Sequence, residues 1–226
     1  MLLNCLWTWR NKGCFEKDFT MPTNYASMIY KYAKEVKGAR KEFARVRGIK
    51  KEVAVRRRVP MEGWVKLNVD GASKGEGRIA GCGGLIWECR GKWICGYSRK
   101  LGSCSAMRAE VWAVLTGLEL AIKYNCNRVV VESDSVVVVS ILKAMQVDDA
   151  PVPKIVQQIG SVFCHFCSIA FVHVYREANS CADAMANYSF MQADIRVVFD
   201  RPPVVNRLLL NDYMGIAYPR LVLIQE

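Results

Sequence analysis

The chain has 226 residues, 52% of them hydrophobic, and a formal net charge of +11. This length and composition allow one sizeable buried core with a small appendage, so a globular protein is expected. No apolar stretch reaches the roughly 18 residues of a membrane span, and the first residues contain no apolar run of signal-peptide length. We therefore expect an intracellular protein of the nucleus or cytoplasm that is not secreted and has no contact with a membrane.

The positive charge is concentrated at the start of the chain. Residues 1–59 contain 15 Lys and Arg against 5 Asp and Glu, whereas residues 60–190 and 191–226 are close to neutral. The first segment has enough helix formers for one or two basic helices but too few large apolar residues for a core of its own. It is interpreted as a basic arm that meets nucleic acid or another polyanion, or alternatively as a solvated linker.

The organised part begins near Pro60 with three predicted strands. Residues 63–70 alternate apolar and polar side chains, which is the period of a strand. Residues 81–101 predict two further strands joined at Arg90 and Gly91. Together these segments predict an antiparallel meander.

Helices and strands then alternate along the chain. The segment 105–125 carries an apolar stripe at helical spacing, with Ser105 or a neighbouring residue available as its N-cap. The β-branched run 128–134 predicts a strand buried on both faces. The remaining predicted elements are helices over 135–146 and 152–163, a strand over 168–174 and a helix from about Asn179. This order predicts the α/β class, with a mixed five-stranded sheet of three antiparallel strands followed by parallel strands and with helices packed on it.

Four acidic residues fall at the ends or beginnings of these elements. Asp70 and Asp134 each end a predicted strand, and Glu110 and Asp183 lie in the first turns of predicted helices. The carboxyl ends of adjacent parallel strands border the usual ligand crevice of such sheets, so the four side chains are expected to converge there. Clustered carboxylates repel one another unless cations neutralise them, and hard oxygen ligands favour Mg²⁺ or Mn²⁺.

Four stretches in this order carry a family resemblance: "NVDGASKG", "RAEVWAVLTGLELA", "VESDS" and "HVYREANSCADAMAN". With them, the segment from about 64 to 190 resembles the ribonuclease H domain of plant reverse-transcriptase-like proteins derived from non-LTR retrotransposons. The chain is accordingly divided into a basic arm or connector (1–59), a ribonuclease H-like domain (60–190) and a C-terminal tail (191–226).

The resemblance implies a metal-dependent endonuclease that hydrolyses the RNA strand of RNA/DNA hybrids with two ions. The family's acidic tetrad falls on Asp70, Glu110, Asp134 and Asp183. By analogy Asp70 would bridge both ions, Asp183 would complete the ion site that activates water, and the other two would hold the second ion. Arg176, in the loop before the last acid, is the predicted basic residue for the scissile phosphate. No obligate protein partner is evident.

Some positions depart from the family pattern where relatives read the hybrid. Ala106 and Met107 stand before Glu110 where polar groups are usual, and Val136 follows "SDS" in place of a frequent polar residue. Such groups distinguish RNA from DNA through base edges and 2′-hydroxyls. The alternatives are therefore a domesticated nucleic-acid-binding module on the same fold with little or no turnover, or another nuclease task of the same superfamily.

Overall fold

A computed structural model describes residues 49–145, 154–203, 208–210, 214 and 216–224. Within it, Val53–Arg220 form one compact unit. The basic helices predicted for the arm fall mainly on residues 1–48, outside the described residues. The described end of the arm is instead a strand, β1 (Ile49–Val55), which pairs with β8 (Tyr218–Ile224).

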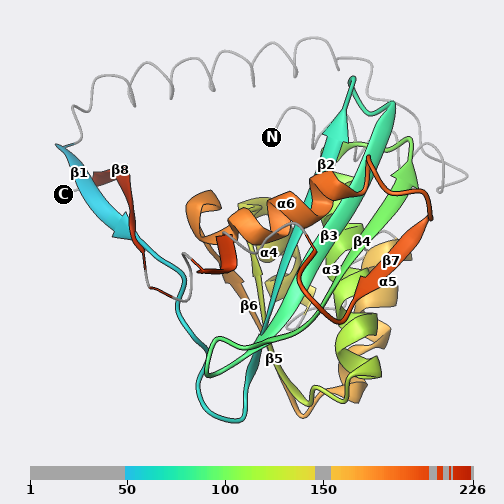
Figure 1. The fold of residues 1–226 in the computed structure, drawn as a ribbon, viewed down its shortest axis with the longest axis horizontal. Coiled ribbons are helices and arrows are strands. Elements are labelled where there is room, and N and C mark those ends of the chain that lie inside the picture. The colour runs from blue at the N-terminus through green and yellow to red at the C-terminus, as the bar shows by residue number, and fades with distance from the viewer. Residues whose placement is uncertain (1–48, 146–153, 204–207, 211–213, 215, 225–226) are drawn as a thin grey trace, which may run out of the picture. The chain divides into compact units, whose positions relative to one another are not determined.

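The main sheet has the strand order β6-β5-β2-β3-β4-β7 (Figure 1). Neighbours are antiparallel from β2 to β7, and β2, β5 and β6 run parallel. The strands are β2 (Val65–Lys74), β3 (Ile79–Glu88), β4 (Trp93–Gly102), β5 (Arg128–Ser133), β6 (Ser168–His173) and β7 (Arg196–Phe199). The predicted mixed α/β sheet is confirmed, with one strand more among the described residues than expected.

The additional strand comes from the predicted tail. β7 pairs antiparallel with the outer edge of β4, with Val197 opposite Ser98. Its four residues are too short for a periodic signal in the sequence, and pairing depends on the free edge that β4 offers. Residues 196–199 of the predicted tail therefore belong to the sheet.

Helices cover both faces of the sheet. They are α3 (Ala106–Lys123), α4 (Val136–Met145), α5 (Lys154–Ser161) and α6 (Ser180–Tyr188), with single 3₁₀ turns η1 (Phe163–His165) and η2 (Arg176–Asn179). The predicted cap is confirmed, because the Ser105 side chain accepts a hydrogen bond from the Arg108 backbone N–H. None of the described helices is long and apolar enough to cross a lipid bilayer.

The larger core lies between the sheet and the helices α3, α4 and α5. It includes Leu67, Val114, Leu118, Val131 and Leu142, none more than 2% exposed. A smaller core lies under α6, which Figure 1 shows crossing in front of β2, β3 and β4. Because both faces are covered, the polar alternation in β2 does not mark a solvent face.

Candidate active site

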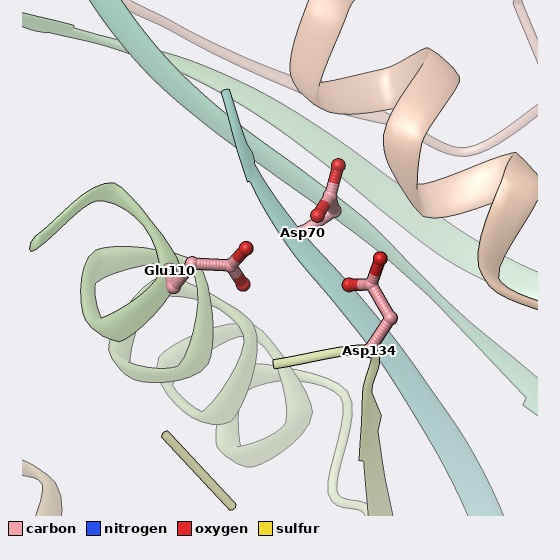
Figure 2. A group of neighbouring side chains, drawn as sticks. All are labelled: Asp70, Glu110 and Asp134. Carbon is pink, nitrogen blue, oxygen red and sulfur yellow. The ribbon is translucent and has the colours of Figure 1, made fainter. Parts of the chain in front are cut away.

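Three of the four predicted acids meet beside the central parallel strands (Figure 2). One carboxylate oxygen each from Asp70, Glu110 and Asp134 lies within 4.8 Å of the others. β2 and β5 pair with Asn68 opposite Glu132. Asp70 and Asp134 each lie two residues further along these two neighbouring segments. Glu110 approaches from the beginning of α3.

The sequence predicted that Asp70 ends its strand, and this prediction is wrong. β2 continues to Lys74 because β3 pairs with it as far as Ile79, whereas the parallel partner β5 stops at Ser133. Asp70 therefore lies inside β2 but just past the end of β5, and it is only 6% exposed. The reversal of the hairpin follows later, where Gly75, Glu76 and Gly77 all have positive φ.

Gly71 allows α3 to come close to Asp70. A Cβ on this residue would lie 2.2 Å from the Glu110 backbone nitrogen, a distance that side-chain atoms do not tolerate. With only hydrogen at this position, the start of α3 rests directly on β2. The short distance between Glu110 and Asp70 depends on this contact.

Burial and mutual repulsion govern the acidic cluster. Burial, and then the negative charges of Glu110, Asp134 and Asp183, raise the pKa of Asp70 from 3.8 to about 9. Burial, followed by the charge of Asp134, raises the pKa of Glu110 from 4.5 to about 8. The cluster thus holds protons at neutral pH until cations compensate the charge.

The donor set fits a hard divalent cation. Glu110 Oε2 is buried and has no hydrogen-bond partner among the residues that the structure describes, and a buried carboxylate oxygen without a partner is costly unless something binds it. Three convergent carboxylates are ligands typical of Mg²⁺ or Mn²⁺ rather than of softer metals. These residues therefore fit the metal expected from the sequence.

Asp183 lies in the first turn of α6 and is paired with an arginine. Arg176 Nη2 donates to Asp183 Oδ1 at 3.0 Å, and this hydrogen bond raises the pKa of the arginine. Asp183 is outside the group of three, although its charge acts on Asp70. Arg176 and Asp183, the other two residues predicted for the site, therefore lie near the three acids and are hydrogen-bonded to each other.

The loop before α6 is held by the chain's C-terminal strand. Arg220 of β8 donates through Nη1 to both carboxylate oxygens of Glu177, at 2.9 and 2.7 Å. Its guanidinium also lies 4.4 Å from the centre of the Tyr175 ring. Arg176 therefore sits between two residues that the tail contacts.

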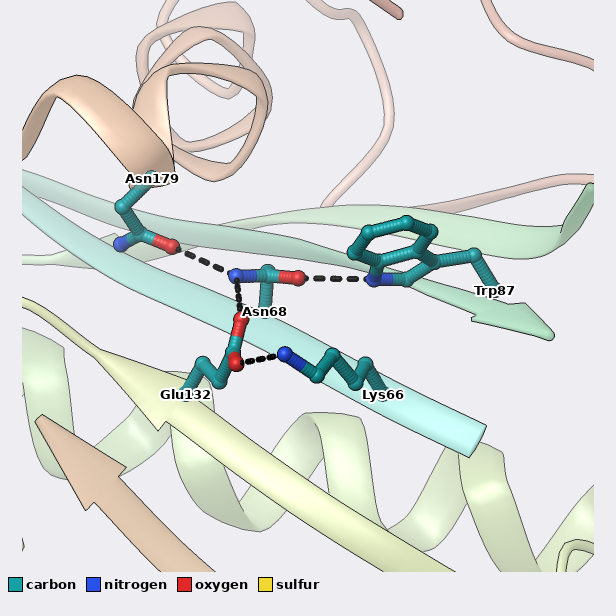
Figure 3. Close-up of polar contacts among 5 residues, drawn as sticks. All are labelled: Lys66, Asn68, Trp87, Glu132 and Asn179. Atoms are coloured by element: carbon teal, nitrogen blue, oxygen red, sulfur yellow. Dashed lines mark hydrogen bonds and ion pairs between the residues drawn. The ribbon is translucent and has the colours of Figure 1, made fainter. Parts of the chain in front are cut away.

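A buried polar network beside the acids was not expected from the sequence. Lys66, Asn68, Glu132 and Asn179 are each at most 8% exposed, and Figure 3 shows them linked to Trp87. The signal was present as polar residues with period two, at 66, 68 and 70 and at 132 and 134. Only the pairing of β2 with β5 shows that these two runs lie side by side.

The sheet order, the helices on both faces and the three convergent acids define a ribonuclease H-like domain. RNase H1 from the halophilic archaeon Halobacterium salinarum matches with a TM-score of 0.53 and 25% identity, covering 57% of this chain and 99% of that one. The N-terminal RNase H domain of a Mycobacterium tuberculosis protein matches with a TM-score of 0.52 and 25% identity, covering 57% of this chain and 94% of that one.

The sequence places the chain within a narrower family. Residues 68–189 match the family model described as "Reverse transcriptase-like", and the chain belongs to this family. An Arabidopsis thaliana protein named "Putative ribonuclease H protein" is 40% identical over 164 residues, which are 72% of this chain. The chain spans 26% of that relative's length.

Proposed function

We propose that this chain is a metal-dependent endonuclease that hydrolyses the RNA strand of RNA/DNA hybrids. The observation that carries the proposal is the group of three carboxylates within 4.8 Å of one another, on a fold shared with ribonucleases H. Family membership and the name of the Arabidopsis relative support the same activity.

Each acid has a role in this proposal. Asp70, Glu110 and Asp134 would hold two divalent ions together with Asp183. When bound, such ions lower the pKa of a coordinated water and stabilise the departing 3′ oxygen. The chain's own contribution is to fix these side chains on β2, β5, α3 and α6, and to release the protons held by Asp70 and Glu110 as the ions bind.

Arg176 is proposed to neutralise the scissile phosphate. Its side chain is 73% exposed and so is open to a nucleic acid backbone, while its bond to Asp183 keeps it beside the acids. An arginine stays protonated at neutral pH, so it contributes charge rather than a proton transfer. Another basic side chain near this loop is His173, which lies at the end of β6 with its ring 5.9 Å from that of Tyr175.

The test is cleavage of a labelled RNA/DNA hybrid in Mg²⁺, with duplex RNA and duplex DNA in parallel. We expect cleavage of the hybrid and its loss in Asp134→Asn, because an amide is a poor replacement for an anionic ligand. Asp194→Asn is the control, since Asp194 is exposed near β7, outside the carboxylate group. Full hybrid cleavage by Asp134→Asn would contradict the assignment of the site.

A second candidate is a nucleic-acid-binding module with little turnover. Its low turnover on hybrids is favoured by apolar side chains at the start of the helices beside the acids: Met107 is 49% exposed and Val136 is 58% exposed. These side chains offer no hydrogen bonds to 2′-hydroxyls. If their effect is weak substrate binding, Met107→Asn should raise kcat/KM on hybrids about tenfold, the value of one hydrogen bond of roughly 1.4 kcal/mol. An equal gain on duplex DNA would show that position 107 does not read ribose.

A further inference from the structure

The hydrogen bonds of the buried network beside the acids run in one direction from donor to acceptor. Trp87 Nε1, which can only donate, lies 2.8 Å from Asn68 Oδ1. The Asn68 amide nitrogen must then face the other way, where it donates to Glu132 Oε2 at 3.0 Å. Glu132 also accepts from the Lys66 ammonium, another group that can only donate. The orientation of the Asn68 amide is therefore set by its partners at both ends.

The orientation of the Asn68 amide also determines the orientation of the Asn179 amide. Asn179 immediately precedes α6. Asn68 Nδ2 donates to Asn179 Oδ1 at 3.2 Å (Figure 3), so the Asn179 nitrogen faces away from Asn68. It donates to the Val69 carbonyl at 2.9 Å and lies 3.5 Å from Asp134 Oδ1. The amide nitrogen is thus anchored on β2 and turned toward a carboxylate of the acidic cluster.

We propose that Trp87, Asn68 and Asn179 form a directed amide relay that positions the Asp134 carboxylate for metal binding, with Asn179 as the positioning residue. The inference rests on the proposed metal-dependent function and concerns the support of that site. The indole N–H donates to the Asn68 oxygen and the Asn68 nitrogen donates to the Asn179 oxygen, which leaves the Asn179 nitrogen 3.5 Å from Asp134 Oδ1. Asn179 is 1% exposed, so no solvent competes for its amide.

The relay also extends to the segment before the domain. The Arg57 guanidinium lies 3.0 Å from the centre of the Trp87 ring, and Arg57 is 9% exposed. This stacking helps to hold the indole at the beginning of the relay. The polar groups of the relay are buried, so reversing the amide of Asn68 or Asn179 would leave neighbouring donors and acceptors without partners.

The experiment measures Mn²⁺ binding by calorimetry without nucleic acid. Asn179→Ala removes the last donor, and Trp87→Phe removes the first while keeping an aromatic ring. The matched control is Gln192→Ala, which removes another buried amide, 7% exposed, that donates to the Ser98, Asp194 and Ile195 carbonyls near β7. Partners that orient metal ligands typically contribute about 10–100-fold to affinity.

We expect Asn179→Ala to weaken Mn²⁺ binding about tenfold, Trp87→Phe to weaken it less, and Gln192→Ala to leave it within about twofold of wild type. The double variant of Trp87 and Asn179 should bind Mn²⁺ no more weakly than Asn179→Ala, because the relay is already broken. On the hybrid, Asn179→Ala should lower kcat with KM unchanged, and excess Mn²⁺ should restore kcat.

Unchanged Mn²⁺ affinity in Asn179→Ala, or an equal loss in Gln192→Ala, would overturn the proposal. Additive losses in the double variant would overturn the relay, because they would make Trp87 independent of Asn179. If Asn179→Ala does not fold, Trp87→Phe alone decides, with wild-type affinity counting against the relay. A wild-type protein that binds Mn²⁺ but cleaves no hybrid would contradict the proposed function without affecting this result.

Discussion

At the scale of single residues, the buried carboxyl of Asp70 determines how the metal-free protein responds to pH. Its pKa is raised from 3.8 to about 9, first by burial, so the folded state keeps a proton that the unfolded chain loses. The contribution of Asp70 to the free energy of unfolding should therefore be most favourable below about pH 4 and become less favourable as the pH rises toward 9. Glu110, with a pKa raised to about 8, adds a change of the same sign.

Urea unfolding in a chelator should show this loss. Between pH 5 and pH 8 we expect Asp70 to cost the wild-type protein about 4 kcal/mol in the free energy of unfolding, and Asp70→Asn to lose clearly less than the wild type. Asp70→Asn should also be as stable as wild type or slightly more stable at pH 8, because folding no longer requires a buried carboxyl to keep a proton that the unfolded chain loses at that pH. Equal slopes for both proteins would contradict the pKa shift of Asp70.

Gly71 is the residue whose substitution should damage the site most directly. An added Cβ meets the Glu110 backbone at 2.2 Å, so Gly71→Ala must push α3 away from β2. We expect a loss of about 1–3 kcal/mol or more in the free energy of unfolding, together with weaker Mn²⁺ binding. The control is Gly102→Ala, where an added Cβ would meet no atom of the described part of the chain within 4 Å apart from its chain neighbours, and only the positive φ of 70° adds strain. It should lose about 1 kcal/mol and keep its Mn²⁺ affinity.

At the scale of elements, β8 holds the loop that leads into α6. The Arg220–Glu177 pair is partly exposed, with side chains 36% and 30% accessible, so its effect on global stability is expected to stay below about 1 kcal/mol. Its local effect should be larger, because it also places the guanidinium against Tyr175. Arg220→Ala should speed amide hydrogen exchange over residues 174–179 while leaving the core strands unchanged.

The pair Arg196–Glu119 provides a control of similar exposure. These side chains are 36% and 41% accessible and join β7 to α3, away from the loop. Arg196→Ala should leave exchange at residues 174–179 as in wild type. Faster exchange there in both variants, or in neither, would show that Arg220 does not restrain the loop.

At the scale of the whole molecule, the compact unit Val53–Arg220 includes residues 53–59, the end of the segment interpreted as the arm. Val55 and Arg57 are 8% and 9% exposed, and Arg57 stacks on Trp87 inside the unit Val53–Arg220. A chain beginning at 53 should therefore keep the stability of the full chain, whereas one beginning at 60 should lose about 1–2 kcal/mol. Thermal unfolding of the two truncated proteins tests this.

The same truncation at 53 tests the basic arm. Residues 1–52 hold 12 Lys and Arg against 5 acidic residues, so removing them should weaken hybrid binding and flatten its dependence on salt. Affinity measured at several salt concentrations gives the slope. An unchanged slope and affinity would make the segment a linker, the alternative that the sequence left open.

The local elements were largely determined by the sequence. The period of the apolar residues predicted the strands and helices of residues 60–190, and Ser105 predicted the start of α3, because both signals act within a few residues of the chain. Asp70 and Asp134 could be assigned to one crevice because they lie at equivalent positions of neighbouring parallel segments, although only β5 ends there and β2 continues to Lys74.

Only the tertiary structure decided which polar side chains became buried partners. Asn68 and Glu132 are 64 positions apart, and they meet because β2 and β5 pair in one register, while α6 packs against β2. A period of two reports that residues share a face but not whether a helix covers it, so Lys66 and Asn68 gave no sign of burial. β7 likewise formed only because β4 offered an open edge, since a short strand is stabilised by its partner rather than by its own sequence.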